Sequence, residues 1–268
     1  MVFAAALFCQ LLIAASALAI PSSSDRLAAR VARRAAGSHL SRPKIPVSSV
    51  STLTSGGNVT HAETSENWSG AVLVASSGTF KSVTGTFTVP TPKSPSGSRG
   101  SSAASAWVGI DGDTCDTAIL QTGVDFTVDG SEVSFDAWYE YYPDFATDFS
   151  GITVHAGDEI KLTVTASSTT SGTAVIENVT RGQTVSKSLS SSAKLCQENA
   201  EWIVEDFEEG DSLVPFANFG TVEFTGASAT TSSGTVTPAG ATLIDIEQNG
   251  QVLTSASTSG SSVTVSYV

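Results

Sequence analysis

The 268-residue sequence is short of positive charge and of cysteine, and each shortage excludes a class of protein. Only 13 Lys and Arg residues face 26 Asp and Glu residues, which gives a net charge of −13. A surface this acidic repels phosphate backbones, so we exclude nucleic acid as a partner. Three cysteines are too few for a disulfide-dense scaffold, and they lack the clustered spacing of a structural zinc site. A hydrophobic content of 40% argues against disorder.

Long apolar runs are missing except at the N-terminus. Residues 1–19 are rich in Ala and Leu, carry no charge and end in Ala17-Leu18-Ala19, the small-x-small pattern that signal peptidase prefers. We therefore predict a signal peptide over 1–19, although no basic residue precedes the apolar run. A retained signal anchor is the alternative, but Gln10 and the many alanines make a weak span. We expect a secreted, extracellular protein without membrane association once the signal is removed.

The charge is divided unevenly between two parts of the chain. Residues 1–60 carry six basic groups and one acidic group, a net charge of +5. Residues 61–268 carry seven basic groups and 25 acidic groups, a net charge of −18. Four arginines recur at helical spacing: Arg26, Arg30, Arg33 and Arg34. After Pro46 the chain is rich in Ser, Thr and Gly, typical of a linker. We predict a basic pro-segment and linker over 20–62 that shields the acidic domain; a solvated tail without a role is the alternative.

Secretion also determines how the cysteines are interpreted. Cys9 leaves with the signal peptide, so the mature chain retains two cysteines in an oxidising compartment, and we predict a Cys115–Cys196 disulfide. Three sequons fit the same compartment without showing that a glycan is attached; they begin at Asn58, Asn67 and Asn178.

From residue 66 onward almost every segment alternates between apolar and polar residues. Short runs rich in Val, Thr, Ile and aromatics are separated by Gly, Ser, Asn and Asp, which predicts many short strands joined by turns. Asn249-Gly250 is a strong two-residue hairpin signal. We predict an all-β fold, one antiparallel β-sandwich domain over 63–268. The expected strands are 68–75, 79–89, 103–111, 117–127, 133–142, 159–167, 173–180, 183–189, 200–208, 219–225, 241–247 and 262–267.

Four of these strands mix acids or amides with aromatics on one face, because alternate residues of a strand point the same way. A core face would exclude unpaired acids, and a solvent face would carry few tryptophans. We interpret the mixture as an extended binding cleft; a sheet with scattered surface acids is the alternative. The residues that share a face on each strand are Trp107, Gly109 and Asp111; Ile119, Gln121, Gly123 and Asp125; Asp136, Trp138, Glu140 and Tyr142; and Glu201, Ile203, Glu205 and Phe207.

Common hydrolytic motifs are missing from the chain. It contains no GxSxG, no HExxH and no Asp-Thr-Gly, the nearest string to the last being Gln121-Thr122-Gly123, and both mature cysteines are expected to be oxidised. The remaining catalytic options are a pair of carboxylates, or a carboxylate with an amide partner.

Several long motifs in consistent order carry a specific resemblance. They are Glu66-Asn67-Trp68-Ser69-Gly70, Trp107-Val108-Gly109-Ile110-Asp111-Gly112-Asp113-Thr114-Cys115, Ala118-Ile119-Leu120-Gln121-Thr122-Gly123, Asp136-Ala137-Trp138-Tyr139-Glu140-Tyr141-Tyr142-Pro143, Asn199-Ala200-Glu201-Trp202-Ile203-Val204-Glu205-Asp206-Phe207-Glu208 and Val214-Pro215-Phe216-Ala217. Over about 63–268 the chain resembles the fungal glutamic peptidases, the eqolisin family.

The resemblance implies a secreted acid endopeptidase, made as a preproprotein, with a concanavalin-like or jelly-roll sandwich. The family's catalytic dyad corresponds to Gln121 and Glu205, and its motif selects Glu205 over Glu201. Cys115 and Cys196 match paired positions in the family. Neither a metal nor another cofactor is implied; the expected partners are protein or peptide substrates, and the chain is expected to be a monomer. The resemblance further implies that eight residues line or support the cleft: Trp68, Trp107, Asp111, Asp125, Trp138, Glu140, Tyr142 and Phe207.

Two rival functions use the same kind of cleft. A jelly-roll glycoside hydrolase would need two carboxylates, for which Glu140 and Glu205 are available, and a sugar-binding lectin would need none. Neither rival requires Gln121, which therefore favours the peptidase.

Overall fold

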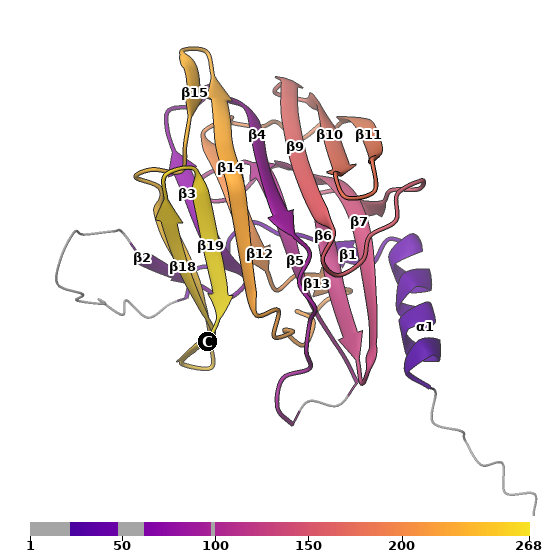
Figure 1. The fold of residues 1–268 in the computed structure, drawn as a ribbon. Helices are drawn as coiled ribbons and strands as arrows, with labels where there is room; N and C mark the ends of the chain where they lie inside the picture. Colours follow the sequence, from indigo (N-terminus) through magenta and orange to yellow (C-terminus); the bar gives the residue numbers. More distant parts are fainter. Residues whose placement is uncertain (1–21, 48–61, 98–99) are drawn as a thin grey trace, which may run out of the picture.

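The structure, a computed structural model, describes residues 22–47, 62–97 and 100–268 (Figure 1). The predicted signal peptide, most of the predicted linker and the sequon at Asn58 lie outside the described residues. None of the helices in the described ranges is long and apolar enough to cross a bilayer.

Two large sheets pack face to face (Figure 1), which confirms the predicted β-sandwich. Every strand pair is antiparallel except β2 with β16. The eight-stranded sheet has the order β11-β10-β9-β4-β14-β19-β18, with β15 beside β14. Its strands are β4 (Phe80–Thr88), β9 (Glu159–Ser168), β10 (Ser171–Asn178), β11 (Gln183–Ser190), β14 (Thr221–Thr231), β15 (Gly234–Val236), β18 (Thr254–Ser259) and β19 (Ser262–Tyr267).

The nine-stranded sheet has the order β17-β16-β3-β12-β5-β6-β7-β8, with β2 beside β16. Its strands are β2 (Ala62–Ser65), β3 (Trp68–Val74), β5 (Ser101–Ile110), β6 (Ile119–Asp129), β7 (Glu132–Tyr142), β8 (Thr147–Asp148), β12 (Asn199–Glu205), β16 (Thr242–Gln248) and β17 (Gln251–Val252). The predicted hairpin turn joins β16 to β17, with positive φ angles of 53° at Asn249 and 75° at Gly250. Such angles suit a two-residue turn that matches the strand twist.

Each predicted strand is present, with ends that shift by a few residues. The largest differences are at β14, which continues to Thr231, and at β12, which ends at Glu205 rather than at residue 208. The sequence analysis missed β18, because Thr254–Ser259 is almost entirely Ser, Thr and Ala and has no apolar alternation. It also missed the short β1, β2, β8, β13, β15 and β17.

The nine-stranded sheet is covered on both faces. All seven residues of β12 and all eleven of β6 are buried. One face packs on the eight-stranded sheet through side chains such as Val108, Leu120 and Trp202. The opposite face carries a separate apolar cluster of Trp68, Val72, Trp107, Ile119, Trp138, Ala146, Ile203 and Ile244. This second face is the predicted cleft face, and here it is not open to solvent.

The N-terminal segment supplies the cover. Helix α1 (Ser23–Ala35) packs beside β6, β7 and β8 (Figure 1) and confirms the helix expected from the arginine spacing. Its Leu27 is buried against the domain. The two-residue strand β1 (His39–Leu40) then pairs with β13 (Glu208–Glu209), and the chain continues across the face to Val47. The N-terminal segment is therefore docked on the domain, over the predicted cleft face, as the prediction of a shielding segment requires.

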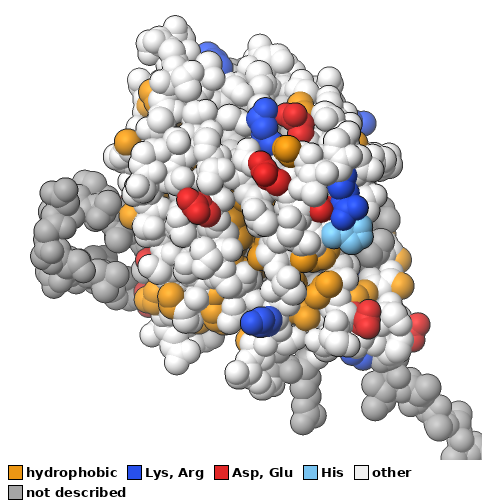
Figure 2. Space-filling model, viewed as in Figure 1, with side chains coloured by type: hydrophobic (Ala, Val, Ile, Leu, Met, Phe, Trp, Pro, Cys, Tyr) orange, Lys and Arg blue, Asp and Glu red, His pale blue; other side chains and the backbone are white. Residues whose placement is uncertain are grey.

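The outer face of the eight-stranded sheet is polar and mostly uncharged. Its side chains are largely threonine and serine, and they bond across strands, as in the Thr84–Thr163 and Ser82–Thr165 hydroxyl pairs. Figure 2 shows this side of the molecule as mostly uncharged, with isolated Lys, Arg, Asp and Glu side chains. Scattered charge of this kind does not indicate a site.

Candidate active site

Gln121 and Glu205 project from the same face of the nine-stranded sheet. The ladder places Gln121 of β6 between Gly109 of β5 and Glu140 of β7. It places Glu205 of β12 between Trp68 of β3 and Ser105 of β5. Gly109 and Ser105 are four residues apart on one strand, so the two candidate dyad residues lie two same-face rows apart.

Tryptophans fill the row between them. Trp107 and Trp138 lie on either side of Gly123 in the ladder. A Cβ on Gly123 would approach the Cβ of Trp107 to 2.5 Å, so the two indoles need a glycine between them. The Nε1 atom of Trp107 donates a hydrogen bond to Glu205 Oε2 over 2.8 Å. The ring that fills the middle row thus also holds the carboxyl group.

Glu140 holds the amide of Gln121. Nε2 of Gln121 donates to Glu140 Oε1 over 3.0 Å, and both side chains are buried. This bond turns the amide nitrogen of Gln121 toward Glu140.

Ser41 of the N-terminal segment lies directly on this pair. Nε2 of Gln121 also donates to the Ser41 carbonyl oxygen over 2.9 Å, while the Ser41 N–H donates to Glu140 Oε2 over 3.1 Å. One residue on, the Arg42 carbonyl accepts from Trp68 Nε1 over 3.0 Å. The backbone of Ser41 and Arg42 therefore lies across the site, and the carbonyl that meets Gln121 belongs to the Ser41–Arg42 peptide bond.

Burial under this segment changes the pKa values of two glutamates, Glu205 and Glu140. It raises the pKa of Glu205 well above its ordinary value; the Ser41 hydroxyl and the Trp107 indole counteract the rise in part. It likewise raises the pKa of Glu140, against hydrogen bonds from the Ser41 N–H and the Gln121 amide, and the nearby charges of Glu205 and Asp125 raise it further. Water stabilises a charged carboxylate better than a protein interior does, so covering the site favours the neutral acids.

Arg30 of α1 forms ion pairs with acidic residues beside the dyad. Its guanidinium lies 3.5 Å from Asp125, 3.3 Å from Asp136 and 3.4 Å from Glu209, and its side chain is only 3% exposed. It also stands over the ring of Phe207, 5.5 Å from the centroid. Arg26 forms a second contact, with Asp129. The predicted opposition of charges thus takes the form of specific ion pairs.

The remaining predicted site residues are distributed as follows. Phe207 stacks edge-on against His39, with ring centroids 4.3 Å apart. Tyr142 packs against the tryptophan cluster. Asp111 departs from the predicted face, because β5 ends at Ile110 and Asp111 has a positive φ of 72°. Its carboxylate accepts the backbone N–H groups of residues 197, 198 and 199, which is a supporting contact for the loops.

The predicted Cys115–Cys196 disulfide is present and ties the loop after β5 to the residues before β12. The sequon asparagines Asn67 and Asn178 are each only 1% exposed. Both amides bond to the protein, Asn67 to Pro43 and Asn178 to Thr153.

Three residues at the site were not predicted from the sequence: one belongs to the N-terminal segment and two contact it. Ser41 lies on the dyad, Glu208 pairs with Arg42, and Asp113 pairs with Lys44. A local signal existed for the segment alone: prolines at 43 and 46 favour an extended chain for the residue before each.

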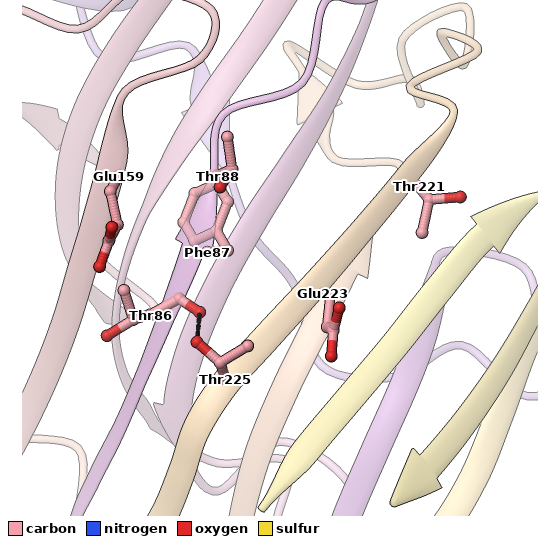
Figure 3. A pocket seen from close by; sticks show the side chains of 7 residues that line it. All are labelled: Thr86, Phe87, Thr88, Glu159, Thr221, Glu223 and Thr225. Atoms are coloured by element: carbon pink, nitrogen blue, oxygen red, sulfur yellow. Dashed lines mark hydrogen bonds between the residues drawn. The ribbon is translucent and has the colours of Figure 1, made fainter.

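A solvent-filled depression of about 380 Å³ lies elsewhere, on the outer face of the eight-stranded sheet. Figure 3 shows its lining, mainly threonines with Glu159 and Glu223, and the hydrogen bond from Thr225 to the Thr86 carbonyl. Its lining includes no amide side chain and one aromatic ring, that of Phe87, unlike the tryptophan cluster beside Gln121.

A β-sandwich with a buried glutamate and a buried glutamine on one sheet face, beneath the chain's own N-terminal segment, has the arrangement expected of a glutamic-type endopeptidase. The comparisons agree, because a sequence model described as the Peptidase A4 family matches residues 66–267. The chain belongs to this family, the eqolisins, and is a hydrolase whose substrates are proteins or peptides.

Known relatives cover most of the chain. Aspergillopepsin-2 of Aspergillus niger is 52% identical over 96% of each chain. Scytalidopepsin B of Scytalidium lignicola is 50% identical over 79% of this chain and 81% of its own. Among solved structures, scytalido-glutamic peptidase with a transition state analog inhibitor superposes with a TM-score of 0.70 and 49% identity, covering 76% of this chain and 98% of that chain. Aspergilloglutamic peptidase from Aspergillus niger superposes with a TM-score of 0.61 and 62% identity, covering 62% of this chain and 99% of that chain.

Proposed function

We propose that this chain is the precursor of a secreted, monomeric acid endopeptidase that uses Gln121 and Glu205 as a catalytic dyad. The observation that carries the proposal is the hydrogen bond from Gln121 Nε2 to the Ser41 carbonyl oxygen. A donor that holds a peptide carbonyl in a buried site is placed to stabilise the oxyanion that forms there during hydrolysis.

The chemistry follows from the two groups. The Glu205 carboxylate takes a proton from water as the water oxygen attacks the scissile carbonyl carbon, and then passes it to the departing nitrogen. The Gln121 amide donates to the developing oxyanion and stays neutral at every working pH. Glu140 acts indirectly: it accepts from Gln121 over 3.0 Å and so keeps the amide nitrogen turned toward the substrate.

We further propose that residues 20–62 form a pro-segment that occupies the cleft until acid releases it. The Ser41 backbone contacts Gln121 and Glu140, and the single guanidinium of Arg30 contacts three carboxylates beside the dyad. Glu205 is fully buried under the segment, and burial raises the pKa of its carboxyl, which favours the neutral form that cannot act as a base.

Acid weakens the ion pairs that hold the segment. Arg26 lowers the pKa of Asp129 from its ordinary 3.8. A carboxylate with a depressed pKa stabilises the docked state above its free pKa, and this contribution disappears as the pH falls through the depressed value. Glu205 and Glu140 act in the opposite sense, because a pKa that docking raises favours the docked state in acid. We expect the loss of charge at Asp129 and at other Asp and Glu residues to outweigh them and to release the segment below about pH 4.

The dyad is tested by acid digestion of a denatured protein, with products identified by mass spectrometry. Glu205→Gln and Gln121→Ala should each reduce proteolysis at pH 3–4 to background, whereas Glu201→Gln should keep it. Glu201 is the matched control because it lies on the same strand and face and is equally buried. Near-wild-type activity in either dyad variant, with an unchanged circular dichroism spectrum, would refute the assignment.

A further inference from the structure

The N-terminal segment crosses the site in a defined direction and so marks where residues after a cleaved bond lie. The Ser41 carbonyl meets Gln121, which places Ser41 before that bond, Arg42 first after it and Lys44 third. The backbone contacts of residues 44 and 45 continue along the domain: Lys44 N–H donates to the Gly112 carbonyl over 2.9 Å, and Ile45 N–H to Asn67 Oδ1 over 2.8 Å.

Lys44 sits in an acidic pocket. Its Nζ contacts Asp113 Oδ1 and lies 2.6 Å from Glu63 Oε2. The Lys44 side chain is 11% exposed and that of Asp113 only 4%, so solvent screens this pair far less than it screens a surface ion pair. Burial opposes the charge of Lys44, but the bonds to Asp113 and Glu63 outweigh it and raise the pKa of its ammonium group.

The loop that carries Asp113 is held rigidly on both sides. Before it, Asp111 accepts three backbone N–H groups of residues 197–199. After it, the Thr114 N–H donates to Asn199 Oδ1 over 3.0 Å, and Cys115 is bonded to Cys196. The position of Asp113 therefore does not depend on Lys44, and it is expected to persist when the segment leaves.

From this placement we infer that Asp113 forms a substrate subsite that selects Lys or Arg at the third residue after the cleaved bond. The inference rests on the proposed function, because it uses Gln121 to locate that bond. Arg42, closer to the bond, also pairs with an acid of the domain, Glu208. This ion pair is weaker because the Arg42 side chain is 44% exposed. The pro-segment thus uses side chains that the activated enzyme accepts in its substrates.

The test uses activated enzyme and peptides with a single cleavage site that differ only at the third residue after the cleaved bond. Lys, Met and Glu are compared there, Met being an uncharged side chain of similar length. Wild-type enzyme should cleave the Lys peptide with a kcat/KM about tenfold or more above the Met peptide, as expected for a hydrogen bond between charged groups. The Glu peptide should be the poorest substrate.

The variant Asp113→Asn should reduce the Lys preference, the ratio of kcat/KM for the Lys and Met peptides, below about twofold. Asp116→Asn is the matched control, since Asp116 is exposed in the same loop and its loss removes the same charge; it should keep the preference. A Lys preference that survives in Asp113→Asn, or equal cleavage of the three peptides by wild type, would overturn the subsite.

A separate measurement avoids any folding defect of the variant. A synthetic peptide of residues 38–47 should inhibit wild-type enzyme, and its Lys44→Met form should inhibit about tenfold less strongly; equal inhibition would contradict the subsite. The proposed function fails in a different way, namely if no peptide is cleaved in acid or if Glu205→Gln still cleaves the Met peptide.

Discussion

The indole nitrogen of Trp107 lies 2.8 Å from Oε2 of Glu205 and donates to it. Both side chains are fully buried, where a hydrogen bond to an ionised group is stronger than in water. This contact opposes the burial that raises the pKa of Glu205. In the proposed mechanism Trp107 is therefore a positioning residue for Glu205, and its hydrogen bond favours the ionised carboxylate.

Replacing this donor should move the pH dependence of the reaction. We expect Trp107→Phe to raise the pKa of Glu205, because the ionised form loses a hydrogen bond. The acidic limb of the kcat/KM profile, where the base becomes protonated, should shift to higher pH by about one unit. The profile is measured with a peptide substrate between pH 2 and 6.

Trp138→Phe is the control for the loss of an indole from the same apolar cluster. Trp138 Nε1 donates to Ser105 Oγ over 3.1 Å rather than to Glu205, so the acidic limb should stay in place even if the rate falls. The interpretation would be wrong if both variants shifted the limb equally, or if Trp107→Phe lowered the rate at every pH without a shift.

Arg30 offers a second prediction, on how the pro-segment is held. Substitution Arg30→Gln leaves Asp125, Asp136 and Glu209 without the guanidinium that faces them. Removing one partner from a buried ion cluster costs about 3 kcal/mol, so a synthetic segment of residues 22–47 carrying this change should inhibit the activated enzyme about 100-fold less strongly. Full-length Arg30→Gln should also become active at a higher pH than wild type.

Arg33 supplies the comparison because it pairs with the same Glu209, at 3.0 Å, from a side chain that is 58% exposed. Exposed pairs contribute less than about 1 kcal/mol, so Arg33→Gln should change inhibition by no more than about fivefold. Equal effects of the two substitutions would show that the segment is held by net charge, without a specific role for the buried arginine.

Much of the architecture was predictable because it depends on neighbours in sequence. Alternation along single strands correctly placed Gln121 and Glu205 on the face opposite the main core, and Asn249-Gly250 correctly marked a turn. The prediction differed at Asp111, where the backbone takes a positive φ after Ile110 and the period-2 rule no longer applies.

Contacts between distant segments could not be predicted in the same way. Gln121 pairs with Glu140 within one hairpin, whose register is set by the turn between Asp129 and Glu132; alternation along each strand assigns faces but does not give this register. The path of residues 39–47 across the sheet is harder still to predict from the sequence. Its prolines favour an extended chain, but its backbone groups find partners only on the completed sheet, as Ser41 does on Gln121 and Glu140.

Asp206 gives a prediction about stability. Burial raises its pKa to about 8, against a hydrogen bond from Gln248 Nε2 of 2.7 Å; burial also raises the pKa of Asp245 to about 6. A carboxyl group whose pKa is raised by folding binds its proton more tightly in the folded state. Its stabilising contribution is complete below the unfolded pKa near 4 and is lost as the pH rises through the folded value.

The domain should therefore be most stable in acid and lose stability between about pH 4 and pH 8. Asp206→Asn keeps an acceptor for Gln248 but cannot ionise, so it should raise the melting temperature at pH 7 by at least about 2–4 °C, equivalent to about 1 kcal/mol in a domain of this size. At pH 3 the variant should match wild type. Asp211→Asn, at an exposed position, should change neither value. Thermal unfolding followed by circular dichroism at both pH values decides the matter: a variant no more stable than wild type at pH 7 would mean that Asp206 ionises there without cost.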